Sequence, residues 1–257
     1  MIYLIGGNGF VGSGWARLFE RLGLEFRVLT RENFDTFRGT TCDILVNANG
    51  NSKKFLSDRE PMTDFDQSVR SVADSLHGIR ARRYVFLSSG DVYPRQDRPN
   101  VTGEDQEIDL AASSRYGRHK RLAEMLVQAE HPDWVIFRMG GFVGPGLRKN
   151  AIFDMLTGAP VWLHPDSELQ FIGTDTAAEI GWSIVQSGIS REVINMGASG
   201  TVRLGDVHAL IGSSSPWREG ASKVRFELSL SKLANLSQIK VPGTEMEIRA
   251  FLERKTQ

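Results

Sequence analysis

Short apolar runs alternate with amphipathic segments of helical length along the first half of the chain. The apolar runs predict strands at Ile2–Ile5, Phe26–Thr30, Ile44–Ala48, Tyr84–Ser88 and Trp134–Met139. The amphipathic segments predict helices at Val11–Leu22, Asp64–Gly78 and Ser113–Ala129. This alternation predicts an α/β fold with a doubly wound parallel sheet, whose ligands gather at the carboxyl ends of the strands.

The connection between the second and third predicted strands is unusually short. Only about a dozen residues separate Thr30 from Asp43, too few for the helix and strand that a complete nucleotide-binding half would place there. We therefore predict that one strand of the usual arrangement is missing.

A glycine-rich turn follows the first strand directly. Gly6, Gly9 and Gly12 stand where the backbone must turn sharply, approach a pyrophosphate and pack closely on the sheet. The helix that follows directs its N-terminal amides at the phosphates. Tight turns also use glycine for steric reasons alone, but the strand, turn and helix together predict a dinucleotide site in a Rossmann-like sheet. We assign Phe10 and Val11 in the turn, and Asn47 at the end of the third strand, to the same cofactor site.

The pattern loosens after Gly140 into short elements. They are predicted at Ala151–Leu156, Val161–Leu163, Gln170–Ile172, Asp175–Gln186, Val193–Met196, Val224–Leu228 and Thr244–Arg254. These pieces are too short to form a domain alone. We therefore expect a dinucleotide-binding domain over residues 1–139 and a small substrate-binding region over 140–257 that caps the sheet on the same core.

Composition narrows the class of protein. The 257 residues include 31 basic and 31 acidic side chains, so no global field attracts nucleic acid or an anionic membrane. The single cysteine, Cys42, excludes an internal disulfide and suits a reducing cytoplasm. No apolar run reaches membrane-spanning length, and the first strand leaves no room for a signal peptide. We expect a cytoplasmic protein without a metal site, because the histidines lack ligand spacing.

Candidate chemistry lies at Ser89, Tyr116 and Lys120. Ser89 directly follows a predicted strand, which places its hydroxyl at the carboxyl edge of the sheet. Tyr116 and Lys120 are four residues apart on a helix, so they share one face, and the ammonium can lower the pKa of the phenol from about 10. We expect Ser89 to hydrogen-bond a substrate carbonyl or alcohol, Tyr116 to transfer a proton and a cofactor to transfer a hydride. The neighbouring His119 is expected to be a surface or packing residue.

The order of these motifs resembles that of the extended short-chain dehydrogenase/reductases, the NAD-dependent epimerase/dehydratase family that modifies nucleotide sugars. Later segments also resemble this family, namely Phe137–Arg138 with Val143–Gly146, Gln170–Asp175 and Ser231–Leu233. The resemblance covers nearly the whole chain. It implies that Ser89, Tyr116 and Lys120 are catalytic and that Lys120 also binds the nicotinamide ribose. It further implies a homodimer that pairs through the helix Ser113–Ala129 and the helix before it.

The resemblance also indicates substrate contacts. Asp91 stands where sugar dehydratases of the family carry a glutamate base, although an aspartate after Gly90 also suits a simple turn. Asn150 is placed to reach the diphosphate or the sugar. Arg218 lies where many relatives hold a nucleotide diphosphate, although a loop arginine is usually only solvated.

Three positions depart from the family pattern. Ser68 replaces an asparagine that helps to organise the active site, Gly141 replaces a substrate-binding asparagine of epimerases, and Gly90 replaces an acid of dehydratases.

The end of the second predicted strand bears on the choice of cofactor. NAD enzymes usually carry an acid there for the ribose hydroxyls, whereas this chain reads Thr30-Arg31-Glu32. Arg31 falls where a guanidinium can bind a 2′-phosphate, and Glu32 lies one residue later. We therefore favour NADP(H) over NAD(H), with a solvated Arg31 as the alternative.

These observations predict an NAD(P)-dependent oxidoreductase acting on a nucleoside-diphosphate sugar, most simply by reducing a 4-keto-6-deoxy sugar. Epimerisation with a bound, recycling cofactor is the next interpretation, and dehydration is disfavoured by Gly90. A reductase of a non-sugar carbonyl and a non-catalytic dinucleotide-binding module also remain open.

Overall fold

A six-stranded parallel sheet forms the centre of the computed structural model, which describes residues 1–51 and 54–255. Its strands lie in the order β2-β1-β3-β4-β5-β9. They are β1 (Ile2–Ile5), β2 (Phe26–Leu29), β3 (Thr41–Asn47), β4 (Arg80–Ser89), β5 (Trp134–Met139) and β9 (Glu192–Met196). Each neighbouring pair is parallel. The predicted doubly wound sheet is therefore confirmed.

The strand order reverses at β1. Ile2 pairs with Phe26 of β2 on one side and with Ile44 of β3 on the other. In sheets of this type the ligand crevice lies outside the carboxyl ends of the strands at this reversal, and the glycine turn directly follows β1. Within the described sheet β2 is the edge strand, and the short 3-10 turn η1 (Phe34–Phe37) links it to β3. The predicted loss of one strand is thus confirmed.

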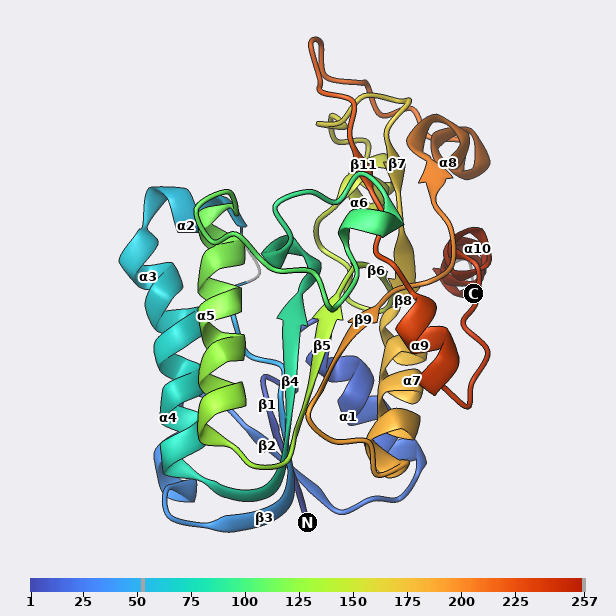
Figure 1. Ribbon diagram of the computed structural model, residues 1–257. Helices are drawn as coiled ribbons and strands as arrows, with labels where there is room; N and C mark the ends of the chain where they lie inside the picture. The colour runs from blue at the N-terminus through green and yellow to red at the C-terminus, as the bar shows by residue number, and fades with distance from the viewer. Residues whose placement is uncertain (52–53, 256–257) are drawn as a thin grey trace.

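Helices cover both faces of the sheet (Figure 1). On one face α1 (Gly12–Arg21) packs beside α7 (Thr174–Gln186), and Trp15 and Phe19 are fully buried with Phe137 of β5. On the other face α4 (Ser71–Gly78) and α5 (Arg115–Glu130) enclose a second apolar cluster. Apolar side chains on both sides of every central strand explain why the strands read as continuous apolar runs.

The predicted helix Asp64–Gly78 is one part of a longer helical run. The whole run comprises α3 (Pro61–Phe65), the π-helical turn η2 (Asp66–Arg70) and α4. A preceding helix, α2 (Lys54–Arg59), was not predicted. Pro61 is suited to the start of α3, because the first helical position needs no backbone N–H donor.

The segment after Gly140 divides between two layers. Two small sheets form there from β6 (Gly141–Val143) with β8 (Phe171–Gly173), and from β10 (Val202–Arg203), β7 (Glu168–Leu169) and β11 (Arg225–Phe226). They accompany α6 (Ala151–Thr157), α8 (Leu204–Ile211), α9 (Ser231–Leu236) and α10 (Thr244–Lys255). Figure 1 shows most of these elements on one side of the carboxyl ends of β4 and β5. However, β9 and α7 join the main sheet layer, so the expectation that all these pieces only cap the sheet was incomplete.

None of the helices within residues 1–51 and 54–255 combines the length and apolar character needed to cross a membrane.

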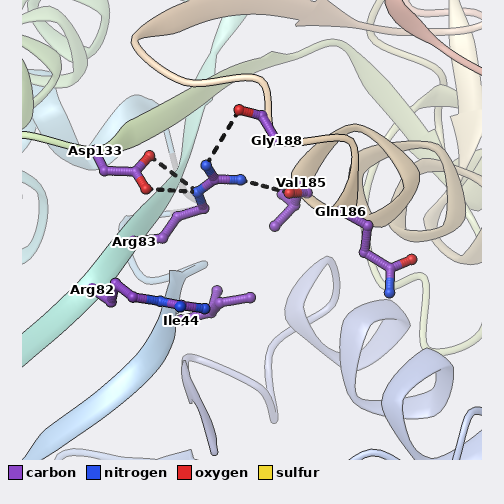
Figure 2. A pocket seen from close by; sticks show the side chains of 7 residues that line it. All are labelled: Ile44, Arg82, Arg83, Asp133, Val185, Gln186 and Gly188. Atoms are coloured by element: carbon purple, nitrogen blue, oxygen red, sulfur yellow. Dashed lines mark hydrogen bonds and ion pairs between the residues drawn. The ribbon is translucent and has the colours of Figure 1, made fainter.

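Arg83 joins elements at the amino ends of the strands, away from Ser89. Its Nε lies 3.0 and 3.1 Å from the two carboxylate oxygens of Asp133, and one terminal nitrogen donates to the carbonyl of Val185 at 2.6 Å. Figure 2 shows this guanidinium between Asp133 and the end of α7, where it lines a surface hollow. The arginine is already paired within the fold, so we assign it a structural role.

A buried ion pair attaches α5 to the sheet. The Glu124 carboxylate is fully buried, and Arg138 of β5 donates to its two oxygens at 3.1 and 2.9 Å. Ser88 donates to Oε1 at 2.6 Å, and Arg121 donates to Oε2 at 3.2 Å. Arg138 also donates to the Tyr93 hydroxyl at 2.8 Å. This network connects α5 to β4 and β5 directly beside the carboxyl edge of the sheet.

The variant Glu124→Gln tests this attachment. Removing the charge leaves the buried Arg138 guanidinium without its counter-ion, so we expect the free energy of unfolding to fall by about 3–5 kcal/mol. Urea unfolding followed by circular dichroism measures this loss. The control Glu130→Gln changes an exposed acid at the end of the same helix and should shift stability by less than about 0.5 kcal/mol. Equal effects of the two variants would contradict a structural role for the pair.

Candidate active site

The turn after β1 has the shape that a dinucleotide pyrophosphate requires. Gly6 adopts a positive φ of 76°, which favours glycine, and the Gly9 amide donates to the Gly6 carbonyl at 2.9 Å. A Cβ atom on Gly12 would collide with the Gly6 carbonyl. The first turn of α1 contains no acidic residue and no side-chain cap, so a bound anion would meet the positive end of the helix dipole without repulsion. These residues fit the pyrophosphate of NAD(P).

The three candidate catalytic residues come together at the carboxyl edge of the sheet. Ser89 ends β4, and its hydroxyl is hydrogen-bonded to that of Tyr116 on α5. The 3-10 turn η3 (Gly90–Val92) follows Ser89 and packs against the first turn of α5. Gly117 allows this approach, because a Cβ atom there would collide with the Asp91 carbonyl. The three residues are therefore neighbours in the structure. Their catalytic role stays a prediction.

Lys120 lies one helical turn after Tyr116 and is buried. Its Nζ donates to the Leu87 carbonyl at 3.1 Å and lies 4.7 Å from the centroid of the Phe86 ring. Burial lowers the pKa of Lys120 to about 8, against the opposing influence of Glu124 and Asp64. The ammonium is therefore close to its titration point at physiological pH.

The pKa of Tyr116 differs from the sequence-based expectation. Burial raises it above the ordinary value, the charges of Asp91 and Asp64 act in the same direction, and only the hydrogen bond to Ser89 opposes them. We expected Lys120 to lower this pKa, which was wrong for the cofactor-free protein, because helical spacing revealed the cation but not the depth of burial. Tyr116 is thus a neutral phenol.

Asp91 faces the Ser89 hydroxyl. The Ser89 hydroxyl donates to its Oδ2 at 2.9 Å, and its backbone N–H donates back to Ser89 Oγ at 3.2 Å. Lys54 of α2 donates to Asp91 Oδ1 at 2.7 Å, while 63% of the Lys54 side chain remains exposed. Sequence reasoning missed Lys54, because the only available signal was its position shortly after β3.

A second group that sequence reasoning missed lies behind Lys120. The Asp64 carboxylate of α3 is fully buried, and its Oδ2 lies 2.6 Å from His119 Nδ1. The Asn51 amide donates to Oδ1 at 2.7 Å. His119 packs edge-on against the Phe65 ring, which agrees with the expected packing role, and it is also a partner of a buried carboxylate. An acid and a histidine 55 positions apart give no signal in one sequence.

The other predicted cofactor residues surround the glycine turn to different degrees. Phe10 lies edge-on to Phe142, with ring centroids 6.5 Å apart. Arg31 is exposed in the turn after β2. Asn47 is fully buried, where it donates to the Tyr84 hydroxyl at 2.7 Å and accepts from the Asn49 N–H at 2.9 Å. The Asn47 side chain therefore links the loop after β3 to Tyr84 of β4.

The predicted substrate residues Asn150 and Arg218 have local partners. The Asn150 side chain accepts from the Phe153 N–H at 2.9 Å and donates to the Phe142 carbonyl at 2.9 Å, which caps α6. The Arg218 guanidinium stacks 3.8 Å from the centroid of the exposed Trp162 ring. Both contacts stabilise the local structure. The role of Asn150 and Arg218 in binding substrate stays a prediction.

Ser68, which replaces the asparagine of the family pattern, lies in the π-helical turn η2. Its hydroxyl is buried and makes no hydrogen bond to the described residues. It therefore lacks the ordering contacts that an asparagine could provide here.

The sheet reversal, the glycine turn and the Ser89–Tyr116–Lys120 set define a dinucleotide-dependent enzyme fold. Comparison with known proteins agrees with this class. Residues 2–197 match the model of the family described as NAD dependent epimerase/dehydratase family. The chain belongs to this family and is an NAD(P)-dependent enzyme of the extended short-chain dehydrogenase/reductase class.

Solved structures share the fold over the whole chain. A UDP-galactose 4-epimerase is 22% identical with a TM-score of 0.79, and the match covers 100% of this chain and 99% of the other. MoeE5 in complex with UDP-glucuronic acid and NAD is 17% identical with a TM-score of 0.82 and the same coverage. RMD from Pseudomonas aeruginosa complexed with NADPH is 15% identical with a TM-score of 0.77, covering 98% and 99%. A search of curated protein sequences gave no significant match.

The ionisation of Lys120 predicts an alkaline limit to activity. Because its pKa is about 8, the ammonium loses its proton as the pH rises through that value, and the charge beside Tyr116 disappears. We expect kcat/KM for the cofactor, which reports ionisations of the free enzyme, to fall about tenfold per pH unit above that point. Rate profiles from pH 6 to 10 measure this. The exposed control Lys240→Gln should leave the profile unchanged, whereas a flat wild-type profile up to pH 10 would contradict the assignment.

Proposed function

We propose that the protein reduces the keto group of a nucleotide-activated sugar with NAD(P)H, most simply a 4-keto-6-deoxy sugar to its alcohol. The observation that carries this proposal is the buried Ser89–Tyr116–Lys120 set at the carboxyl edge of the sheet. The nucleoside-diphosphate part of the substrate is supported by the structural neighbours, which include proteins with bound UDP sugars.

Each residue of the set has one task in this reaction. The cofactor supplies a hydride to the carbonyl carbon when it is bound. Ser89 hydrogen-bonds the carbonyl oxygen and polarises it, and Tyr116 donates a proton to that oxygen as negative charge develops. Lys120 binds the nicotinamide ribose and stabilises the tyrosinate that remains. Asp91, hydrogen-bonded to Ser89, lies within reach of the same substrate region.

Tyr116 carries a proton in the free enzyme, although its raised pKa also makes it a weak acid. A phenol whose pKa is raised by burial holds its proton at neutral pH. It can therefore act directly as the general acid that carbonyl reduction requires, whereas alcohol oxidation first requires its deprotonation.

Dehydration is less well supported. Elimination of water needs a further acid near the substrate, and Gly90 offers no side chain at the position where dehydratases carry one. A Cβ atom on Gly90 would lie 2.9 Å from the Leu228 side chain, so this position is closely packed.

Epimerisation is the second candidate function. The specific support is the fold shared with a UDP-galactose 4-epimerase and a UDP-glucuronic acid 4-epimerase. An epimerase takes a hydride from the sugar and returns it to the opposite face, so the cofactor is not consumed. An epimerase therefore keeps its cofactor bound with no net oxidation, whereas a reductase oxidises one NAD(P)H for each sugar that it reduces.

The central experiment supplies NADPH and a nucleoside-diphosphate 4-keto-6-deoxyhexose and follows cofactor absorbance and sugar products. One cofactor oxidised per sugar supports the reductase. Sugar isomerisation without net oxidation, by protein purified with a tightly bound oxidised cofactor, supports the epimerase.

Tyr116→Phe should lower turnover in this assay by about 10²–10⁴-fold, because the general acid is lost. The cofactor Kd and the circular dichroism spectrum should stay unchanged. The matched control Tyr3→Phe removes a buried phenol on β1 and should keep turnover near the wild-type value. A Tyr116→Phe enzyme with near-normal turnover would refute the mechanism.

We further propose that NADPH is preferred and that Arg31 binds its 2′-phosphate. Arg31 is exposed at the end of β2, where a bound adenosine ribose reaches in Rossmann-like sheets. Solved structures that share the fold include one with NAD and one with NADPH.

Arg31→Ala should weaken NADPH binding by about ten- to a hundredfold, because a charge-assisted hydrogen bond contributes roughly 1.5–3 kcal/mol. NADH affinity should change by less than about threefold, because NADH has no 2′-phosphate for Arg31 to bind. Calorimetric titration of both cofactors measures this difference. The control Arg27→Ala removes another exposed arginine from β2. Equal weakening of both cofactors, or a wild-type preference for NADH, would make Glu32 the candidate ribose ligand.

Two further expectations stay predictions. Pairing of two chains through α5 is supported by the exposed side chain of Met125 on that helix. A cytoplasmic location is supported by the single cysteine and the balanced charge.

A further inference from the structure

We propose that Asp91 and Lys54 supply protons to Tyr116 from the protein surface, along a path that runs through one hydroxyl group. That hydroxyl belongs to Ser89. The inference rests on the proposed reduction, because each carbonyl that becomes an alcohol consumes one proton as well as one hydride. Tyr116 gives up its proton in every cycle and is left as a tyrosinate, which must be protonated again before the next reduction.

Each link of this path is a hydrogen bond or an ion pair in the structure. The hydroxyls of Tyr116 and Ser89 are hydrogen-bonded to each other. Ser89 Oγ donates to Asp91 Oδ2 at 2.9 Å, and Lys54 Nζ lies 2.6 Å from the same carboxylate oxygen. Nζ also donates to Oδ1 at 2.7 Å. Consecutive contacts therefore join the phenol to the ammonium, and no further group is needed to complete the path.

Solvent exposure rises along the path. Tyr116 and Ser89 are buried, with 9% and 8% of their surfaces exposed. The Asp91 side chain is 14% exposed, and that of Lys54 is 63% exposed. The phenol therefore meets little solvent, whereas the ammonium at the other end of the path can exchange protons with water.

Two polar side chains on the other side of Tyr116 do not continue such a path. The Lys120 ammonium donates to the Leu87 carbonyl, which accepts a hydrogen bond but cannot hold a proton and pass it on. The Ser68 hydroxyl, on the turn η2 that packs against α5, forms no hydrogen bond to the described residues. The Asp91 carboxylate can take up a proton and release it, so the path on its side is the one suited to proton transfer.

The transfer balances as the movement of one proton. After reduction the Ser89 hydroxyl turns from Asp91 to the tyrosinate oxygen, and the Ser89 O–H bond breaks as the Tyr116 O–H bond forms. The Lys54 ammonium gives a proton to the Asp91 carboxylate, and the resulting acid restores the Ser89 hydroxyl. Lys54 is left as an amine and takes a proton from a solvent acid. The net change is one proton carried from solvent to Tyr116, and no electrons move along the path.

The need for a supply of protons distinguishes reduction from epimerisation. An epimerase removes a proton from the sugar hydroxyl and returns it to the same oxygen after the hydride has come back. Tyr116 would then recover its starting form without solvent. A proton path to the surface is therefore useful to a reductase in every cycle.

The variant Asp91→Ala tests the path by stopped-flow measurement of NADPH oxidation with the nucleoside-diphosphate 4-keto-6-deoxyhexose. Tyr116 still carries a proton for the first turnover but regains it slowly afterwards. We expect a burst of about one NADPH oxidised per active site, followed by steady turnover about 10²-fold below that of the wild type, because a positioned proton-transfer group contributes about 10²–10⁴-fold. Added formic or acetic acid should accelerate the slow phase and leave the burst amplitude unchanged. A single phase that does not respond to these acids would overturn the proposal.

The variant Lys54→Arg separates proton supply from charge. An arginine keeps the positive charge that pairs with Asp91, but its guanidinium does not release a proton. We expect steady turnover to fall by about tenfold or more and to rise with buffer concentration. An ion pair with only a structural role would be restored by arginine, so wild-type turnover in this variant would overturn the proposal. The exposed control Lys240→Arg should behave as the wild type. Because the Lys54 side chain is mostly exposed, this test remains if Asp91→Ala does not fold.

These measurements separate failure of this inference from failure of the proposed function. If the wild type reduces the keto sugar and the Asp91→Ala and Lys54→Arg variants show none of the expected changes, the path is wrong and the reductase stands. If the wild type does not oxidise NADPH with the keto sugar, the reductase is wrong and the path that serves it is overturned with it.

Discussion

The role proposed for Lys120 requires a positive charge, although this side chain is buried beside the carboxyl end of β4. Desolvation opposes the charged form, and the surrounding groups offset only part of that cost, which leaves the pKa at about 8. The Leu87 carbonyl and the Phe86 ring come from β4, while the negative charges come from α3 and α5. Three elements therefore provide the surroundings of this one cation.

Two of the acids on the elements around Tyr116 have cationic partners. Glu124 is bound by Arg138 and Asp91 by Lys54. The charges of Asp91 and Asp64 nevertheless raise the pKa of Tyr116, in the same direction as burial. Burial then decides the ionisation of Tyr116, which stays protonated.

The sequence predicted features that are local along the chain. The bounds of β1 and β5, the glycine turn and the shared helix face of Tyr116 and Lys120 follow from short-range patterns. It did not predict α2, or the pairing of Asp64 with His119, because such contacts join residues distant in sequence and leave no periodic signal. Spacing also gave the neighbour of Tyr116 but not its burial, so the direction of the pKa shift was wrong.

The relative placement of Ser89 and Tyr116 depends on a residue that carries no chemistry. Gly117 lets the backbone of α5 touch the Asp91 carbonyl, and the Ser114 hydroxyl caps the helix by accepting from the Gly117 N–H at 3.1 Å. A backbone contact cannot rotate away as a side chain can, so it fixes the first turn of α5 against η3. Main-chain packing thus sets where the end of β4 meets the first turn of α5, while burial and the charges of Asp91 and Asp64 set the ionisation of Tyr116.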